Sequence, residues 1–148
     1  MHGTQALAEI IRELLAQQHL GVLATNADGA PHPSLVGFKA LEDMRGLLFV
    51  TGRATRKFGN LKRDNRASML IDNRSHRAAD FRLAMALTAQ GRVKEIDTKT
   101  NMAMMAVYIE RFPHLEEFAR SPGCALMSLQ VERYSLVRRF QDVVELIF

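Results

Sequence analysis

The chain has 148 residues, a length that predicts one domain spanning residues 1–148. Apolar residues make up 47% and charged residues 24% of the chain, a composition that excludes a disordered protein. The single cysteine, Cys124, excludes an intramolecular disulfide. No apolar run is long enough for a transmembrane helix, and no signal peptide is recognisable, so we expect a cytoplasmic protein without a membrane partner. The net charge of +4 permits an anionic ligand but does not by itself indicate nucleic acid.

The first half of the chain begins with apolar residues at helical spacing, which predict a helix over residues 4–18 with Thr4 as its N-cap. A strand over 21–25 and a return strand over 32–40 flank Asp28-Gly29, a strong hairpin signal. Two prolines in the return strand predict that it lies at a sheet edge or beside a ligand. A strand over 47–51 and a helix over 52–64 follow, and the phase of that helix turns Phe58 toward the core.

The second half of the chain continues the alternation of strands and helices. The pattern predicts a strand over 67–72, an irregular polar segment over 73–83 and a long strand over 84–96. Helices over 98–111 and 113–119 precede a mostly extended region over 124–148, with breaks near Glu132 and Gln141. The fold class is therefore α+β: a mostly antiparallel, closed or partly closed barrel of six to eight strands with flanking helices.

Several chemical motifs are absent. The chain has no Gly-rich dinucleotide fingerprint, no phosphate-binding loop of the Walker type and no nucleophile elbow. The histidines lack metal-ligand spacing, so we expect no metal site.

The informative segment runs from Phe49 to Leu61, where an apolar strand ends in Thr51 and a helix opens with Thr55-Arg56-Lys57. The first N–H groups of a helix have no intrahelical partner, and the positive end of the helix dipole adds to them, so a phosphate fits there. The two hydroxyls and the two cations supply further donors. Asn60, one turn after Arg56, is expected on the same side. The alternative is a solvated basic helix face with an ordinary threonine cap, and spacing alone does not separate the two.

With these residues the sequence resembles the pyridoxamine 5′-phosphate oxidase-like family of FMN-binding split barrels. The resemblance covers nearly the whole chain in order: the leading helix, residues 21–25, the 28–32 hairpin, the Thr51 to Leu61 block and residues 87–92. It implies a homodimer with FMN at the subunit interface and a small-molecule redox substrate. The strand after the Asp-Gly turn would line the flavin ring, the Thr51 block would hold the phosphate, and the partner's polar loop at residues 73–74 would close the ring. The implied cofactor contacts are Ser34, Leu35, Val36, Val50, Thr51, Thr55, Arg56, Lys57, Asn60, Asn73 and Arg74.

The sequence also departs from the family. Where true pyridoxamine phosphate oxidases carry a Gln and an Arg before the long strand's Gly, this chain has Ala86 and Thr88. The usual C-terminal segment with Trp, Arg and Pro is missing. The resemblance thus implies that the FMN phosphate site is kept and the vitamin B6 substrate site is lost.

Two main hypotheses follow. The first is an FMN-dependent oxidoreductase, for which no catalytic residue is assigned because the flavin carries the chemistry. The second is a non-enzymatic flavin-binding, storage or stress protein. Related split barrels suggest the deazaflavin F420 or haem as other ligands, with His19, His32 or His76 as nominal axial ligands for haem. Nucleic-acid binding is disfavoured, because the basic stretch has one aromatic residue, Phe58, and its phase places it in the core.

Overall fold

The computed structural model describes residues 2–139 and 141–148; Met1 and Phe140 lie outside this description. In chain order its elements are α1 (His2–Gln17), β1 (Leu20–Ala27), β2 (Ala30–Gly37), β3 (Lys39–Ala40), β4 (Gly46–Gly52), α2 (Arg56–Arg63), β5 (Arg66–Asp72), α3 (Asp80–Leu83), β6 (Met85–Glu95), α4 (Met102–Arg111), the 3₁₀ turn η1 (Pro113–Leu115), α5 (Glu116–Arg120), β7 (Cys124–Arg138) and β8 (Asp142–Ile147).

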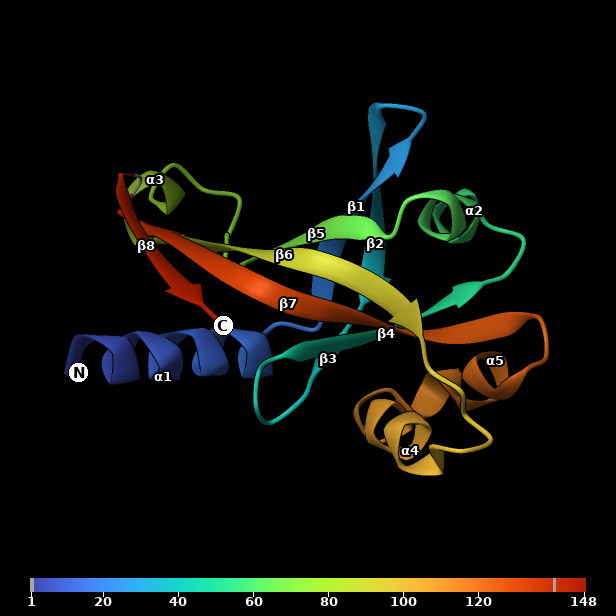
Figure 1. Cartoon of the computed structure of the whole chain (residues 1–148). Coiled ribbons are helices and arrows are strands. Elements are labelled where there is room, and N and C mark those ends of the chain that lie inside the picture. The colour runs from blue at the N-terminus through green and yellow to red at the C-terminus, as the bar shows by residue number, and fades with distance from the viewer. Residues whose placement is uncertain (1, 140) are drawn as a thin grey trace.

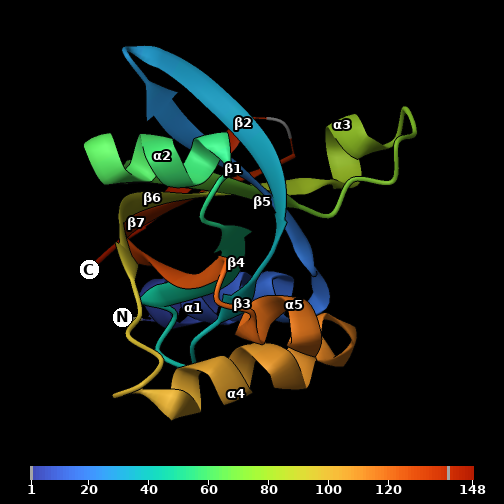
Figure 2. The ribbon, with the colours of Figure 1, turned by 90° about the vertical axis from the view of Figure 1, so that its right-hand side faces the viewer.

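The strands form one antiparallel sheet in the order β2-β1-β5-β6-β7-β4-β3, and β8 pairs with β7. The sheet curls into a half-barrel, so the α+β split-barrel class is confirmed (Figure 1, Figure 2). β2 and β4 are not paired, yet they contact each other across the opening, which we call the split. The split therefore brings together two strands that stand far apart in the sheet order.

The β1–β2 hairpin follows from its turn residues. Asp28 and Gly29 have φ values of 51° and 88°, and the paired residues Ala27 and Ala30 flank them. Positive φ at both central positions is the geometry that Asp-Gly favours in two-residue hairpins. β2, which carries Pro31 and Pro33, lies at the end of the sheet, as its prolines predict.

Two apolar cores hold the molecule together. The larger fills the half-barrel and receives the apolar face of α1, including Ile11 and Leu14. The smaller lies between β4, β7 and the α4–α5 pair, around Leu48, Tyr108 and Leu126. Burying a side chain of this size stabilises the fold by roughly 1.5–3 kcal/mol.

α4 also ties distant segments together. The Arg111 guanidinium donates to the carbonyl oxygens of Leu15 (3.2 Å), Ala16 (3.1 Å) and Gln18 at the end of α1. The last carbonyls of a helix have no intrahelical donor, so this cation satisfies them.

The structure corrects several expected boundaries. Thr4 is not an N-cap, because α1 already includes it, and α2 begins at Arg56 rather than at Gly52. β7 runs without a break past Glu132, which is the extra residue of a β-bulge opposite Gln90 and Gly91. A Cβ on Gly91 would lie 1.8 Å from the Gln130 carbonyl oxygen, so only glycine fits there. The segment expected to be irregular contains the short helix α3.

Candidate functional site

The turn between β4 and α2 brings two threonine hydroxyls together. Thr51 is the second-to-last residue of β4 and is only 2% exposed, and Thr55 is the N-cap of α2. Their hydroxyl oxygens are 2.8 Å apart. The Thr55 hydroxyl donates to the Gly52 carbonyl oxygen (2.8 Å) and accepts from the Phe58 N–H (3.3 Å). The N-cap bond fixes where the helix starts and therefore where its free N–H groups lie.

The start of α2 has unused hydrogen-bonding capacity. Within the described residues, the backbone N–H groups of Arg56 and Lys57 have no acceptor. The Arg56 side chain is exposed and that of Lys57 is half-buried, and no described carboxylate pairs with either. Two amides, two cations and the positive end of the helix dipole form a site for an anion.

The neighbouring cations, in contrast, are neutralised. Arg53 donates to both oxygens of Glu95 (3.0 and 2.8 Å), and the Lys62 ammonium lies 3.9 Å from the same carboxylate. The hydrogen bond from Arg53 holds the pKa of Glu95 below its usual value. Both cations also lie over the Phe58 ring, at 5.6 and 5.2 Å from its centre. Sequence reasoning missed the Arg53–Glu95 pair, because the residues are 42 positions apart.

Asn60 does not lie with Arg56 as expected. Its side chain is 4% exposed, and its amide donates to the Thr25 hydroxyl at 3.1 Å. The Thr25 hydroxyl is 3.4 Å from the His32 carbonyl oxygen. Asn60 therefore fastens α2 to the β1–β2 hairpin, a role for which the sequence offered no signal beyond its spacing.

On the other side of the split, alternate residues of β2 turn inward. Val36 is buried in the larger core, and Ser34 is half-buried with its hydroxyl oxygen enclosed. That oxygen has no hydrogen-bond partner among the described residues. Leu35 points outward and is 64% exposed. Val50 packs against the smaller core, so its side chain does not join that of Thr51.

Asn73 and Arg74 lie at the opposite end of the sheet from α2. β5 separates the two regions, and its seven residues span about 20 Å; Figure 1 shows α3 and α2 at the two ends. The Asn73 side-chain oxygen accepts from the Met85 N–H at 2.6 Å, and Arg74 donates two 2.7 Å bonds to Asp72. Burial raises the pKa of Asp72, but the Arg74 hydrogen bonds outweigh it, so the pKa is lowered overall. One protomer thus does not bring these residues to the Thr51–Lys57 turn.

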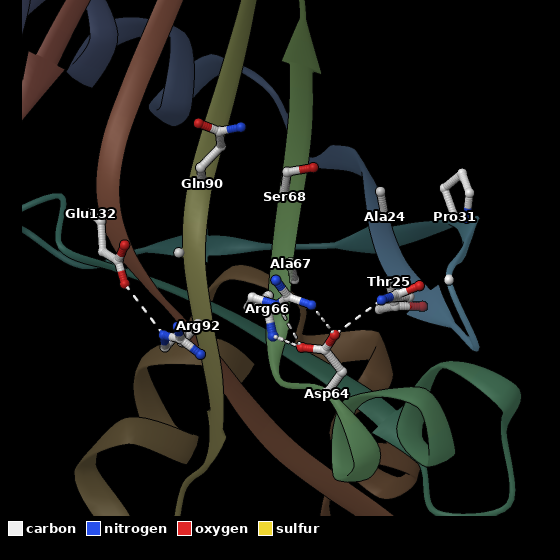
Figure 3. Close-up of a pocket in the computed structure, with 13 residues that line it drawn as sticks. Ala24, Thr25, Pro31, Asp64, Arg66, Ala67, Ser68, Gln90, Arg92 and Glu132 are labelled. Carbon is white, nitrogen blue, oxygen red and sulfur yellow. Dashed lines mark hydrogen bonds and ion pairs between the residues drawn. The ribbon is translucent and has the colours of Figure 1, made fainter.

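A groove of about 530 Å³ opens beside the C-terminal end of α2 (Figure 3). None of the sequence-predicted site residues lines it. Its charges are largely paired: Arg66 binds Asp64 through two bonds of 2.9 and 2.6 Å, and Arg92 lies 3.8 Å from Glu132. A groove whose cations already have carboxylate partners is a weaker anion site than the start of α2.

A larger cavity of about 710 Å³ lies beyond Arg53, between the start of β7 and the α4–α5 pair. Arg53, Glu95 and Cys124 form its wall, and Met105 and Leu126 form part of its apolar lining. Because Cys124 pairs with Gly52, this cavity lies directly behind the turn that precedes α2.

The three histidines considered for haem lie in different surroundings. The His19 ring lies edge-on to Phe112, His32 is half-buried on the inward side of β2, and His76 has a left-handed φ of 62° in an exposed loop. Among residues 2–139 and 141–148, no cluster of His, Cys, Asp and Glu is suited to a metal ion.

A curled antiparallel sheet of this strand order, open between β2 and β4 and flanked by helices, is the fold of a split-barrel protein. The pyridoxamine 5′-phosphate oxidase family model matches residues 7–138, and the chain belongs to that family. None of the curated protein sequences matches it. No helix within the described residues has the length and apolar character needed to cross a membrane.

Solved structures with the same fold are distant in sequence. A heme-binding protein from Mycobacterium smegmatis superimposes with a TM-score of 0.81 at 20% identity, over 92% of this chain and 55% of that one. The chain therefore spans little more than half of the length of that relative. HutZ, a heme storage protein from Vibrio cholerae, superimposes with a TM-score of 0.74 at 20% identity, over 88% of this chain and 92% of that one. An FAD-binding protein from Mesorhizobium loti superimposes with a TM-score of 0.69 at 15% identity, over 87% of this chain and 90% of that one. At these identities the likeness concerns the fold alone.

Proposed function

We propose that this protein binds FMN non-covalently and serves as a flavin-dependent oxidoreductase. The observation that carries the proposal is the start of α2. There, two N–H groups and two cations that have no acceptor or carboxylate partner among the described residues follow the Thr51–Thr55 hydroxyl pair. A phosphate monoester bears up to two negative charges and several acceptor oxygens, so its chemistry complements this set. Arg56 and Lys57 would hold the phosphate.

The enclosed hydroxyl of Ser34 supports the fit of the ring. A buried hydroxyl without a partner costs roughly 1–3 kcal/mol, and a ligand that supplies a partner removes this cost. The flavin ring carries donors and acceptors along one edge. A phosphate at α2 and a ring along β2 would use both sides of the split at once.

Asn60 and Val50 would act indirectly in this arrangement. Asn60 holds α2 against β1, and Val50 anchors the end of β4 in the smaller core. Both would fix the position of the turn rather than touch the cofactor with their side chains.

We propose further that the site is completed by a second copy of the chain. Leu35, Val22 and Leu70 form a row of register neighbours on the outward face of the sheet, and Leu35 and Leu70 are 64% and 37% exposed. Exposed apolar side chains in a row favour association. In such a homodimer the partner would supply Asn73 and Arg74, which one protomer holds away from its own Thr51–Lys57 turn.

Bound flavin would supply hydride or electron transfer, and a small-molecule substrate would meet it at the ring. The chain's own residues would bind the phosphate, orient the ring and exclude water. We assign no acid or base, because the flavin itself carries the redox chemistry.

Haem is the second candidate, and His32 favours it. His32 is half-buried on the same inward face as Ser34, and no described residue hydrogen-bonds to its ring. An imidazole can ligate haem iron, and the heme-binding relatives share the fold.

Titration of the flavin-free protein with FMN and with riboflavin tests the proposal, because riboflavin lacks the phosphate. We expect FMN to bind at least about tenfold more tightly, since each charge-assisted contact contributes roughly 1.5–3 kcal/mol. Equal affinities would contradict the phosphate site. A parallel haem titration that gives a Soret shift lost in His32→Ala, with no FMN binding, would favour the second candidate.

A further inference from the structure

The Arg53–Glu95 ion pair separates two spaces that flank the turn before α2. On one side lies the free start of α2, with Arg56 and Lys57. On the other side lies the 710 Å³ cavity, whose wall includes both members of the pair. The pair has two short hydrogen bonds, and Arg53 is held further by its Nε, 3.4 Å from the Pro122 carbonyl oxygen.

The position of this cavity decides which part of a ligand would reach it. β4 faces β2 across the split on one edge and pairs with β7 on the other. Ser34 lies on the β2 side, whereas Cys124 and the cavity lie on the β7 side. With a flavin ring along β2 and its phosphate at α2, only a group attached beyond that phosphate would extend toward the cavity.

The cavity has the size and lining for such a group. Cavities of about 300–1,000 Å³ hold small organic ligands, and Met105 and Leu126 give this one apolar surface. A second phosphate on the way to it, however, meets the Glu95 carboxylate. Arg53, Lys99 and Arg120 are the cations that line the cavity. Arg53 is the one in the turn before α2, and both ends of its guanidinium fork are engaged by Glu95.

We infer that Glu95 is a specificity residue that selects a flavin with a single phosphate over a flavin dinucleotide. Its carboxylate repels a second phosphate and withholds Arg53 from it, while leaving Arg56 and Lys57 free for the first. Discrimination by an unfavourable charge against the competing ligand is a common basis of specificity. This inference rests on the proposed function, because it assumes that the phosphate lies at the start of α2.

The test compares the dissociation constants of FMN and FAD for the wild type and for Glu95→Gln, measured by quenching of flavin fluorescence. Glutamine keeps the shape of the side chain, removes the repulsion and frees Arg53. We expect the wild type to prefer FMN, and we expect Glu95→Gln to tighten FAD binding by roughly tenfold or more with a much smaller change for FMN. Adding Arg53→Ala to Glu95→Gln should abolish the gain for FAD.

Glu132→Gln is the matched control. It removes an acidic side chain that also pairs with an arginine, Arg92 at 3.8 Å, but in the groove of Figure 3. Glu132→Gln should leave the ratio of the FMN and FAD dissociation constants unchanged. The inference is overturned, while the proposed function stands, if the wild type binds FMN and FAD equally well. It is also overturned if the ratio of the two dissociation constants is the same in Glu95→Gln as in the wild type. A wild type that binds neither flavin overturns the proposed function and the inference with it.

Discussion

The Tyr108 hydroxyl on α4 lies 3.2 Å from the Gly37 carbonyl oxygen at the end of β2, to which it donates a hydrogen bond. Burial raises the pKa of Tyr108 to about 12, and the backbone of Val50 in β4 acts on the same hydroxyl in the opposite direction. One side chain therefore joins the two strands that border the split. The width of the split depends on this contact, because no ladder hydrogen bonds connect β2 to β4.

Tyr108→Phe should weaken both the fold and the site. The Gly37 carbonyl would lose its donor, so we expect the free energy of unfolding in urea to fall by about 1–3 kcal/mol and FMN affinity to fall with it. Tyr134→Phe removes another buried tyrosine hydroxyl, which lies away from the split. This hydroxyl donates to the Met44 carbonyl oxygen at a distance of 2.6 Å. It should lower stability but leave FMN affinity unchanged. If the two variants lowered FMN affinity equally, Tyr108 would have no special role in setting the width of the split.

Ser34→Ala should change stability and binding in opposite directions. Removing a buried hydroxyl that lacks a partner relieves its desolvation cost, so the flavin-free protein should become more stable, by about 1 kcal/mol. FMN affinity should fall, because the ring loses a contact. Ser135→Ala, which removes a hydroxyl 3.3 Å from Glu145, is the control and should alter neither quantity much. A less stable Ser34→Ala protein with unchanged FMN affinity would refute this role.

The loop that carries α3 depends on the Asp80 carboxylate. It accepts from the Ser75 hydroxyl (2.6 Å) and from the N–H groups of Ser75 (2.9 Å) and His76 (2.8 Å). These bonds, the Ser75 hydroxyl first, lower the pKa of Asp80 to about 2. Since the folded-state pKa lies below the ordinary value of 3.8, the stabilisation is complete above that value and is lost as the pH falls toward 2.

Asp80→Asn should loosen the same loop at neutral pH. We expect faster trypsin cleavage after Arg77 and Arg82, identified by mass spectrometry, because an amide accepts these hydrogen bonds more weakly than a carboxylate does. Glu117→Gln, an exposed acid on α5, should leave the cleavage pattern as in the wild type. If Asp80→Asn resisted trypsin as well as the wild type does, the Asp80 carboxylate would not be what orders the loop.

Local sequence signals predicted much of the fold. Asp28-Gly29 predicted the first hairpin, the prolines of β2 predicted an edge position or one beside a ligand, and the order of the elements predicted a closed or partly closed antiparallel barrel. The split-barrel class followed from the family resemblance. Boundaries were harder to predict. Residues 52–55 contain nothing that forbids a helix, so only the Thr55 cap in the structure shows where α2 begins. The extended residues around Glu132 contain a bulge that depends on the partner strand, which the sequence of β7 alone does not reveal.

The site was predictable where it is continuous in sequence. The Thr51 and Thr55 hydroxyls lie together, because the end of a strand and an N-cap follow each other within one turn. Their role toward a phosphate stays a prediction. The direction of Asn60 and Val50 was not predictable, because it depends on which face of α2 or β4 packs inward. The pairing of Arg53 with Glu95 joins residues 42 positions apart and has no local signal.

FMN binding by Arg56→Ala/Lys57→Ala tests the central claim most directly. With two charge-assisted contacts of roughly 1.5–3 kcal/mol each removed, the dissociation constant for FMN should rise at least about a hundredfold, while riboflavin affinity and the free energy of unfolding change little. Lys62→Ala/Arg63→Ala removes the same charge from the last turn of α2 and should leave most FMN affinity intact. An unchanged FMN dissociation constant in Arg56→Ala/Lys57→Ala would contradict the account.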